Sequence, residues 1–110
     1  PTRVFGDGGN TRDYVFVDDV VDAFVRAAER GSGLLCNIGT GVESSVLDLY
    51  ATMAANAGVT EPATHAPARK GELARSCLDA SRAELHLGWR PFTDLSAGTA
   101  ATLDWFRERG

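Results

Sequence analysis

One stretch constrains this chain more than any other: residues 4–21, VFGDGGNTRDYVFVDDVV. A glycine-rich polar loop leads directly into Arg12 and Asp13, and a continuous apolar run follows them. An acidic pair, Asp18 and Asp19, then opens an amphipathic segment. Glycine and asparagine tolerate positive φ, so such a loop can turn tightly. We therefore interpret the rest of the chain as support for the arginine that this loop presents.

Short apolar runs bounded by turn residues predict the strands. The runs at 14–17 and 34–38 are continuously apolar, which is typical of strands buried on both faces. The region between Val59 and Cys77 carries a weaker signal, because two prolines and a basic cluster interrupt it. The predicted strands and extended pieces are 3–5, 14–17, 34–38, 63–66 and 76–78.

Apolar spacing and capping residues predict four helices. Each has an expected N-terminal residue, and the first three have a glycine that ends them. The N-terminal residues are, in chain order, Asp18 or Asp19, Ser45, Asp79 and Thr93, and the terminating glycines are Gly31, Gly58 and Gly88. Asp48 lies three positions after Ser45, which predicts a capping box. Four helices with several short strands that make no complete sheet indicate an α+β fold.

Composition narrows the class of protein. With 110 residues, 44% hydrophobic and 24% charged, the chain has the size and composition of one globular domain. Its net charge of −4 at pH 7 disfavours non-specific binding to nucleic acid or to an acidic membrane surface. No apolar run approaches the length of a membrane span. Cys36 and Cys77 have no metal-ligand spacing, so we expect reduced, mostly buried thiols in a cytoplasmic protein.

Two irregular loops each carry an arginine that suits phosphate recognition. Arg12 follows the glycine loop, and Arg69 lies in the basic cluster near Gly71. A guanidinium presents a planar fork of donors that can hold a phosphate bidentately. Two such loops could clamp one diphosphate. On the residues alone an alternative stays open, in which both arginines are solvated or form ion pairs with Asp13 and Glu72.

Other chemistries lack a supporting pattern. The glycines at 6–9 and 39–41 match neither GxGxxG nor a P-loop, so we interpret both as turns. His65 and His86 lie near no serine or cysteine in a familiar nucleophile arrangement. Capping and the helix dipole explain the acidic cluster at 18–22. Spacing alone therefore predicts no catalytic, cofactor-binding or metal-binding residue.

Several stretches, taken in order, resemble the C-terminal portion of the nucleotide-sugar epimerases of the extended short-chain dehydrogenase/reductase family. The UDP-glucose 4-epimerases are the nearest group. The similarity covers nearly the whole chain, and each stretch alone would be weak. The stretches are VFGDG at 4–8, TRDYVFVDDVVDA at 11–23, NIGTGVESSV at 37–46, ARKGEL at 68–73 and DASRAELHLGWRP at 79–91.

The resemblance implies that residues 1–110 are a substrate-binding domain without the Rossmann domain, which in this family holds NAD and a catalytic Tyr-x-x-x-Lys pair. Arg12 and Arg69 would then grip the diphosphate of a UDP-sugar, and Glu72 would accept hydrogen bonds from the ribose. Segment 3–5 would line the uracil pocket, largely through backbone groups. The implied substrate-binding residues are Arg3, Val4, Phe5, Arg12, Arg69 and Glu72.

The chain itself has no Tyr-x-x-x-Lys pair, because its lysine, Lys70, is preceded at that interval by Ala66. The resemblance therefore implies a fragment that is inactive alone and belongs to an NAD-dependent UDP-sugar 4-epimerase. That isomerase inverts C4 of the sugar by oxidation and reduction, with NAD bound by the missing N-terminal part. Two alternatives remain. One is a fragment of a dehydratase, decarboxylase or reductase acting on a dTDP-, GDP- or UDP-sugar, and the other is a non-catalytic nucleotide-sugar-binding module.

The expected partner of such a fragment is the missing Rossmann domain. Pro1 reads as the middle of a strand, which favours a piece of a longer protein. The surface that would cover the Rossmann half is expected to be apolar and exposed, which favours self-association of the fragment. The parent enzyme is expected to be a homodimer.

Overall fold

A computed structural model describes residues 2–30 and 32–110, which form four helices and four short strands. In this part of the chain the elements are β1 (Arg3–Phe5), β2 (Thr11–Arg12), α1 (Val17–Glu29), β3 (Ser44–Ser45), α2 (Val46–Ala57), β4 (Thr64–Ala66), α3 (Ser81–Leu87) and α4 (Leu95–Arg109). β1 pairs with β4 in parallel, with Val4 opposite His65. β2 pairs with β3 in antiparallel, with Thr11 opposite Ser45. The predicted α+β class is confirmed.

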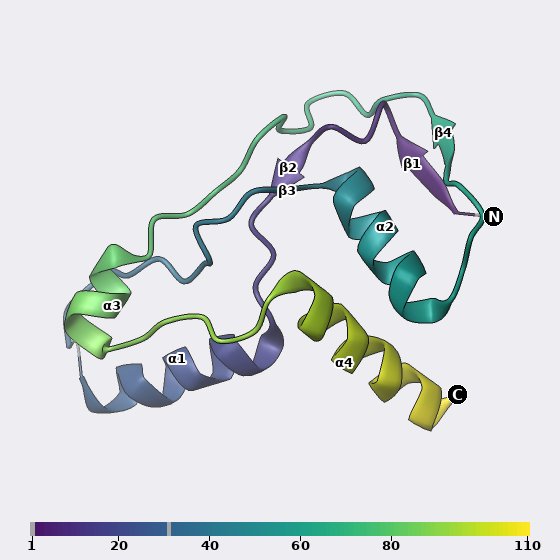
Figure 1. The fold of residues 1–110 in the computed structure, drawn as a ribbon. Coiled ribbons are helices and arrows are strands. Elements are labelled where there is room, and N and C mark those ends of the chain that lie inside the picture. The colour runs from purple at the N-terminus through teal and green to yellow at the C-terminus, as the bar shows by residue number, and fades with distance from the viewer. Residues whose placement is uncertain (1, 31) are drawn as a thin grey trace.

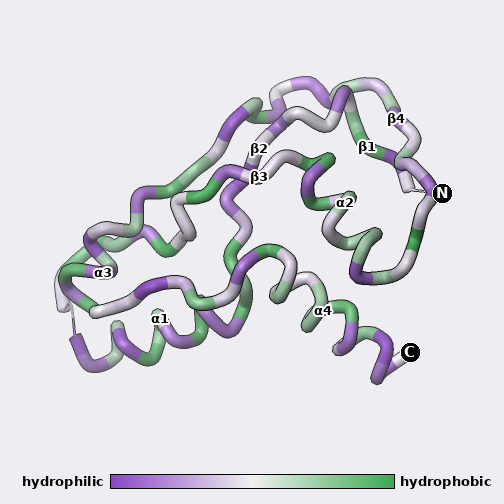
Figure 2. The backbone as a smooth tube through the Cα atoms, in the orientation of Figure 1, coloured by the Kyte–Doolittle hydropathy of each residue, from purple (hydrophilic) through white to green (hydrophobic). Residues whose placement is uncertain are grey.

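The elements form two groups joined by long extended segments (Figure 1). α1 packs on α3 at one end, and α2 packs on α4 toward the other, where β1 and β4 lie beyond α2. The molecule is flat, with extents of 46 × 36 × 18 Å. Its radius of gyration is 16.2 Å, whereas a compact chain of this length has about 13 Å. Many side chains therefore lack cover, and Figure 2 shows hydrophobic residues spread along α1, α2 and α4.

The buried core lies between α1, α3 and the segment that follows α3. Its members are Ala23, Ala83, Leu87 and Trp89. Trp89 is 1% exposed, and its indole nitrogen donates to the backbone oxygen of Asp19 at 2.8 Å. A buried Trp N–H needs such an acceptor, and the bond ties the segment after α3 to the first turn of α1.

The predicted boundaries of α2 are confirmed in detail. The Ser45 hydroxyl accepts from the Asp48 N–H at 3.0 Å, and the Ser45 N–H donates to the Asp48 carboxylate at 3.2 Å. This is the expected capping box. Gly58 ends the helix at φ +72°, and Gly88 ends α3 in the same left-handed conformation at φ +64°. The strands predicted at 3–5 and 63–66 correspond to β1 and β4.

Two predicted strands are wrong. Residues 14–16 form no strand, and Val17 already begins α1. Residues 34–38 are extended without a ladder, because no other strand among the described residues lies beside them. Within this segment Cys36 and Ile38 pack against the core, while Leu35 is 81% exposed. The side chains thus alternate as in a strand, but the backbone lacks the hydrogen bonds that define one.

Several predicted caps are also wrong. The residue before α1 is Phe16, with no side-chain cap, and Asp19 points inward instead. Ala80 occupies the cap position of α3, although Asp79 accepts from the Ser81 N–H at 2.9 Å. α4 begins at Leu95 and is capped by Asp94, not by Thr93. Two of the misassigned side chains bond to each other instead, since the Thr93 hydroxyl donates to the Asp19 carboxylate at 3.0 Å.

Other expectations fall in irregular parts of the chain. Residues 76–78 form no strand, although the Ser76 N–H donates to the Thr11 carbonyl at 3.1 Å. Both cysteines are free, but Cys77 is exposed, contrary to the expected burial. The predicted helix end at Gly31 and the predicted strand at Pro1 lie outside the described residues.

Candidate functional site

The two arginine-bearing loops lie side by side because backbone hydrogen bonds join the chain segments that hold them (Figure 1). The Gly6 N–H donates to the Ala66 carbonyl at 2.7 Å, and the Thr11 N–H donates to the Ala74 carbonyl at 2.8 Å. The glycine loop and the basic loop, which contains Arg69, run between these two points. Segments that are about sixty positions apart in the sequence thus form one edge of the molecule.

Arg12 is held by backbone carbonyls. Its Nη1 donates to the oxygens of Thr11 and Leu73, both at 2.7 Å, and its Nη2 lies 3.5 Å from a carboxylate oxygen of Glu72. The Arg12 and Glu72 side chains are 29% and 32% exposed. The alternative that the sequence left open, in which the two loop arginines form ion pairs with Asp13 and Glu72, is therefore met in part, by the pair of Arg12 with Glu72. Among residues 2–30 and 32–110, Nε makes no hydrogen bond and Nη2 makes only this long one, so both can donate to an anion.

Arg69 lies over the end of β1. Its guanidinium carbon is 4.0 Å from the centroid of the Phe5 ring, and the Phe5 ring is partly exposed. A cation–π contact at an exposed site contributes about 0.5–1 kcal/mol. The two loops approach closely here, since a Cβ on Gly6 would lie 3.3 Å from the Cβ of Ala68. The site residues of the two loops thus form two contacts, Arg12 with Glu72 and Arg69 with Phe5.

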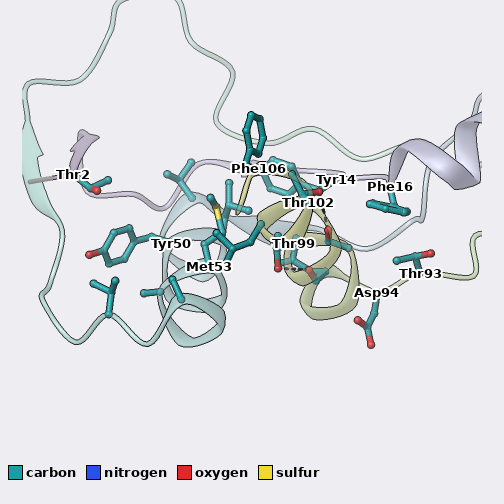
Figure 3. A pocket seen from close by; sticks show the side chains of 18 of the residues that line it. Thr2, Tyr14, Phe16, Tyr50, Met53, Thr93, Asp94, Thr99, Thr102 and Phe106 are labelled. Atoms are coloured by element: carbon teal, nitrogen blue, oxygen red, sulfur yellow. Dashed lines mark hydrogen bonds between the residues drawn. The ribbon is translucent and has the colours of Figure 1, made fainter. Parts of the chain in front are cut away.

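Arg3 and Val4 belong to a different surface. Both line a cavity of about 580 Å³ between β1, α2 and α4, and that lining includes neither Arg12 nor Arg69. Figure 3 shows the cavity from close by, with Tyr50 and Met53 on the α2 side and Thr99, Thr102 and Phe106 from α4. The lining is mostly apolar, and Phe106 remains 62% exposed. Arg3 and Val4 therefore face a cavity that neither Arg12 nor Arg69 lines, whereas Phe5 contacts Arg69.

The sequence analysis missed the role of Asp13. Its carboxylate accepts from the Thr40 N–H at 2.9 Å, the Thr40 hydroxyl at 2.6 Å, the Gly41 N–H at 2.9 Å and the Leu78 N–H at 3.2 Å. The Cys77 sulfur lies at 4.0 Å. Burial by itself raises the pKa of Asp13, but the hydrogen bonds from Thr40, Gly41 and Leu78 outweigh it and lower the pKa.

A second carboxylate, Glu43, was also missed. Arg75 donates to it from Nε at 2.9 Å and from Nη2 at 2.6 Å, and the Thr11 hydroxyl donates at 2.7 Å. The bonds from Arg75, and then that from Thr11, lower the pKa of Glu43 from 4.5 to about 2. Because Thr11 precedes Arg12, this pair also steadies the strand that carries the arginine.

The described residues hold no group of three or more His, Cys, Asp or Glu side chains that suits a metal ion. In the same part of the chain no helix has the length and apolar character needed to cross a membrane.

Curated relatives align with nearly the whole length of this chain. The UDP-glucose 4-epimerase of Mycolicibacterium smegmatis is 50% identical over 109 residues, which are 98% of this chain and 35% of that protein. The dTDP-glucose 4,6-dehydratase of Streptomyces griseus is 34% identical over 96% of the chain and 33% of its own length. The chain thus spans about a third of the curated relatives it matches.

Solved structures of enzymes have the same fold as this chain. The UDP-glucose 4-epimerase of Thermotoga maritima, determined with UDP-glucose, superposes with a TM-score of 0.95 at 39% identity, over 98% of this chain and 35% of that one. The enzyme from Stenotrophomonas maltophila, with bound NAD and formylated UDP-arabinopyranose, gives 0.89 at 36% identity over the same shares. The family described as GDP-mannose 4,6 dehydratase matches residues 1–102. The predicted resemblance is confirmed, and this chain belongs to that family of nucleotide-sugar epimerases and dehydratases.

Proposed function

We propose that this chain is the nucleotide-sugar-binding portion of a UDP-glucose 4-epimerase-like isomerase. The observation that carries the proposal is the pairing of two arginine-bearing loops in a chain that is 50% identical to such an enzyme. Arg12 has donors free for an anion, and Arg69 lies within reach of the same edge, over Phe5. Both guanidinium groups would grip the diphosphate, as the family resemblance implies.

Glu72 has a second part in the proposal. It lies 3.5 Å from Arg12, which is long for an ion pair. A diphosphate on Arg12 would replace that contact, and the carboxylate would then accept from the ribose hydroxyls. This exchange costs little, because a partly exposed pair of this kind contributes only about 0–1 kcal/mol.

Segment 3–5 would hold the uracil base, through backbone groups of Arg3, Val4 and Phe5. Phe5 supports this part of the proposal, because it lies under Arg69 at the edge of the paired loops. The NAD cofactor and the catalytic pair would belong to the rest of the enzyme. In that enzyme the apolar cavity between β1, α2 and α4 would be covered, which explains why the cavity is open and apolar in this chain. The enzyme would be cytoplasmic, and its oligomeric state, expected to be a homodimer, stays a prediction.

The test is calorimetric titration of UDP into the chain and into two variants, Arg12→Ala and Arg69→Ala. Each substitution removes charge-assisted hydrogen bonds to phosphate, so each should weaken UDP binding about tenfold, or about 1.4 kcal/mol. Arg109→Ala is the matched control, since Arg109 also stacks on an aromatic ring, Trp105, at 4.1 Å. Unchanged affinity in both loop variants would rule out the clamp.

A dehydratase is the second candidate, because dTDP-glucose 4,6-dehydratases are also relatives. Its nucleotide carries a methyl group on the base and lacks the ribose 2′-hydroxyl. Titration with UDP and dTDP identifies the nucleotide: tighter binding of UDP, with a preference that Glu72→Gln reduces, supports the UDP-glucose 4-epimerase-like function. Tighter binding of dTDP would favour an enzyme of dTDP-sugars, and the relatives of that kind include a 4-epimerase as well as dehydratases.

A further inference from the structure

Asp13 joins three segments that are distant in the sequence. The residue directly follows Arg12, and its carboxylate accepts hydrogen bonds from Thr40 and Gly41 on one side and from Leu78 on the other. Each donor except the Thr40 hydroxyl is a backbone N–H. A carboxylate that gathers several N–H donors holds their backbones in one arrangement.

Sequence and geometry both fit this close approach. A Cβ on Gly39 would lie 2.8 Å from the Asp13 carboxylate and 2.8 Å from the Cβ of Leu78. Real Cβ atoms do not approach other atoms this closely, so a larger residue at this position would push the two segments apart. The glycine therefore lets residues 39–41 and 77–78 close on the same carboxylate.

The backbone of Arg12 is consequently fixed on both sides. Before it, the Thr11 N–H donates to the Ala74 carbonyl, and the Thr11 carbonyl accepts from the Ser76 N–H at 3.1 Å. After it, Asp13 is anchored as described. The guanidinium then folds back onto the carbonyls of Thr11 and Leu73, so its position depends on these two anchors.

We propose that Asp13 is a positioning residue for nucleotide-sugar binding: it holds Arg12 where the arginine meets the diphosphate. The inference rests on the proposed function and adds a residue that does not itself touch the ligand. A side chain that the fold already holds in its binding position raises affinity, because less conformational entropy is lost when the ligand binds. If the loss of this anchor frees the backbone of about one residue, that residue must be ordered on binding, and affinity falls about tenfold.

The test compares UDP with uridine, which lacks the diphosphate. Asp13→Asn keeps the shape of the side chain but exchanges one acceptor oxygen for a donor, so some N–H groups lose their partner. UDP binding should weaken about tenfold, while uridine binding, followed by NMR titration, stays unchanged. Asp79→Asn is the matched control, because it alters an Asp that accepts from a backbone N–H of Ser81 without contact to Arg12; it should change neither affinity.

A double variant separates positioning from general stability. Once Arg12 is alanine, Asp13→Asn should weaken UDP binding no further, since the effect acts through the arginine. Thr40→Val serves if Asp13→Asn fails to fold by circular dichroism. It removes the hydroxyl bond to Asp13, together with the bond that the Val42 N–H donates to the same hydroxyl at 3.0 Å, but keeps the backbone donors to Asp13. It should reduce UDP affinity by a smaller factor, again without an effect on uridine.

The failures are distinguishable. If the unmodified chain binds no UDP, the proposed function falls and this inference falls with it. If Arg12→Ala weakens UDP binding but Asp13→Asn does not, only the positioning role is overturned. Equal losses for UDP and uridine, or additive losses in the double variant, would show that Asp13 merely stabilises the fold.

Discussion

Asp19 offers the sharpest test of how this flat molecule holds together. The side chain is fully buried near the start of α1. Its carboxylate accepts from the N–H groups of Phe92 and Thr93, both at 3.1 Å, and from the Thr93 hydroxyl at 3.0 Å. These bonds attach α1 to the segment that leads into α4. We predict that Asp19→Ala strongly destabilises the chain, whereas Asp19→Asn has a much smaller effect.

The magnitudes follow from the hydrogen bonds that each variant keeps. Alanine removes the acceptor altogether, and two partly buried N–H groups lose their partner. A hydrogen bond to a charged group contributes about 1.5–3 kcal/mol, so a loss of about 3 kcal/mol is a moderate estimate for the set. Asparagine can point its oxygen at both N–H groups and donate its amide to the Thr93 hydroxyl, which then accepts. Only the charge is lost, and the expected cost is about 1 kcal/mol.

Urea unfolding followed by far-UV circular dichroism measures both values, provided that the slope with urea stays constant. Small proteins have total stabilities of about 5–15 kcal/mol, so the alanine variant should be clearly weakened. Asp104→Ala on the exposed side of α4 is the control and should stay within about 0.5 kcal/mol. An alanine cost below about 1 kcal/mol, or equal costs for alanine and asparagine, would refute this account of Asp19.

Two further predictions concern the loops near the candidate site. Because Arg75 keeps the pKa of Glu43 at about 2, below its ordinary 4.5, ionised Glu43 stabilises the fold fully above pH 4.5, and this contribution disappears as the pH falls toward 2. Glu43→Gln should flatten the stability curve in this acid window, and an unchanged slope would count against the pair. Gly8→Ala should cost about 1–3 kcal/mol more than Gly58→Ala: both glycines have φ above +70°, but a Cβ on Gly8 would lie 2.4 Å from Leu47, whereas Gly58 has open space. Similar thermal unfolding midpoints would contradict this reading.

The parts of the fold that were predictable are those decided by a few neighbouring residues. The capping box of α2 needs only Ser45 and Asp48, and the left-handed ends of α2 and α3 need only Gly58 and Gly88. Such signals are complete within one helical turn, so they do not depend on what packs against the helix. The sequence was therefore a sufficient guide to the number and position of the helices.

The failed predictions depend on distant partners. A strand exists only beside another strand, and residues 34–38 have an apolar sequence but no neighbour of this kind in the described part of the chain. Asp19 has the sequence position of a helix cap, yet its donors are Phe92 and Thr93, more than seventy positions away. Local propensity says nothing about such a partner, and tertiary contacts override it.

In the candidate site, too, the sequence indicated some residues, and contacts with distant residues revealed others. The resemblance to a family was needed to select Arg12 and Arg69, because chemistry alone also fitted surface arginines. The structure then adds Asp13 and Glu43, whose donors come from residues about thirty and sixty positions further along the chain. The one available signal was the proximity of Asp13 to Arg12, together with a glycine turn at 39–41 that had no other assigned role.

The three carboxylates explain how a chain with so small a core can present ordered loops. Asp13, Glu43 and Asp19 each accept from residues far along the sequence, and together they connect the segments that no sheet connects. Contacts between apolar side chains are not directional, whereas a hydrogen bond to a carboxylate constrains both the distance and the angle of each N–H donor. Because Asp13 directly follows β2, and Glu43 accepts from the hydroxyl of Thr11 in β2, the same bonds that order the fold also set the position of Arg12. Loop order and the proposed anion binding would therefore have a common electrostatic origin, and a substitution at either carboxylate is expected to affect both.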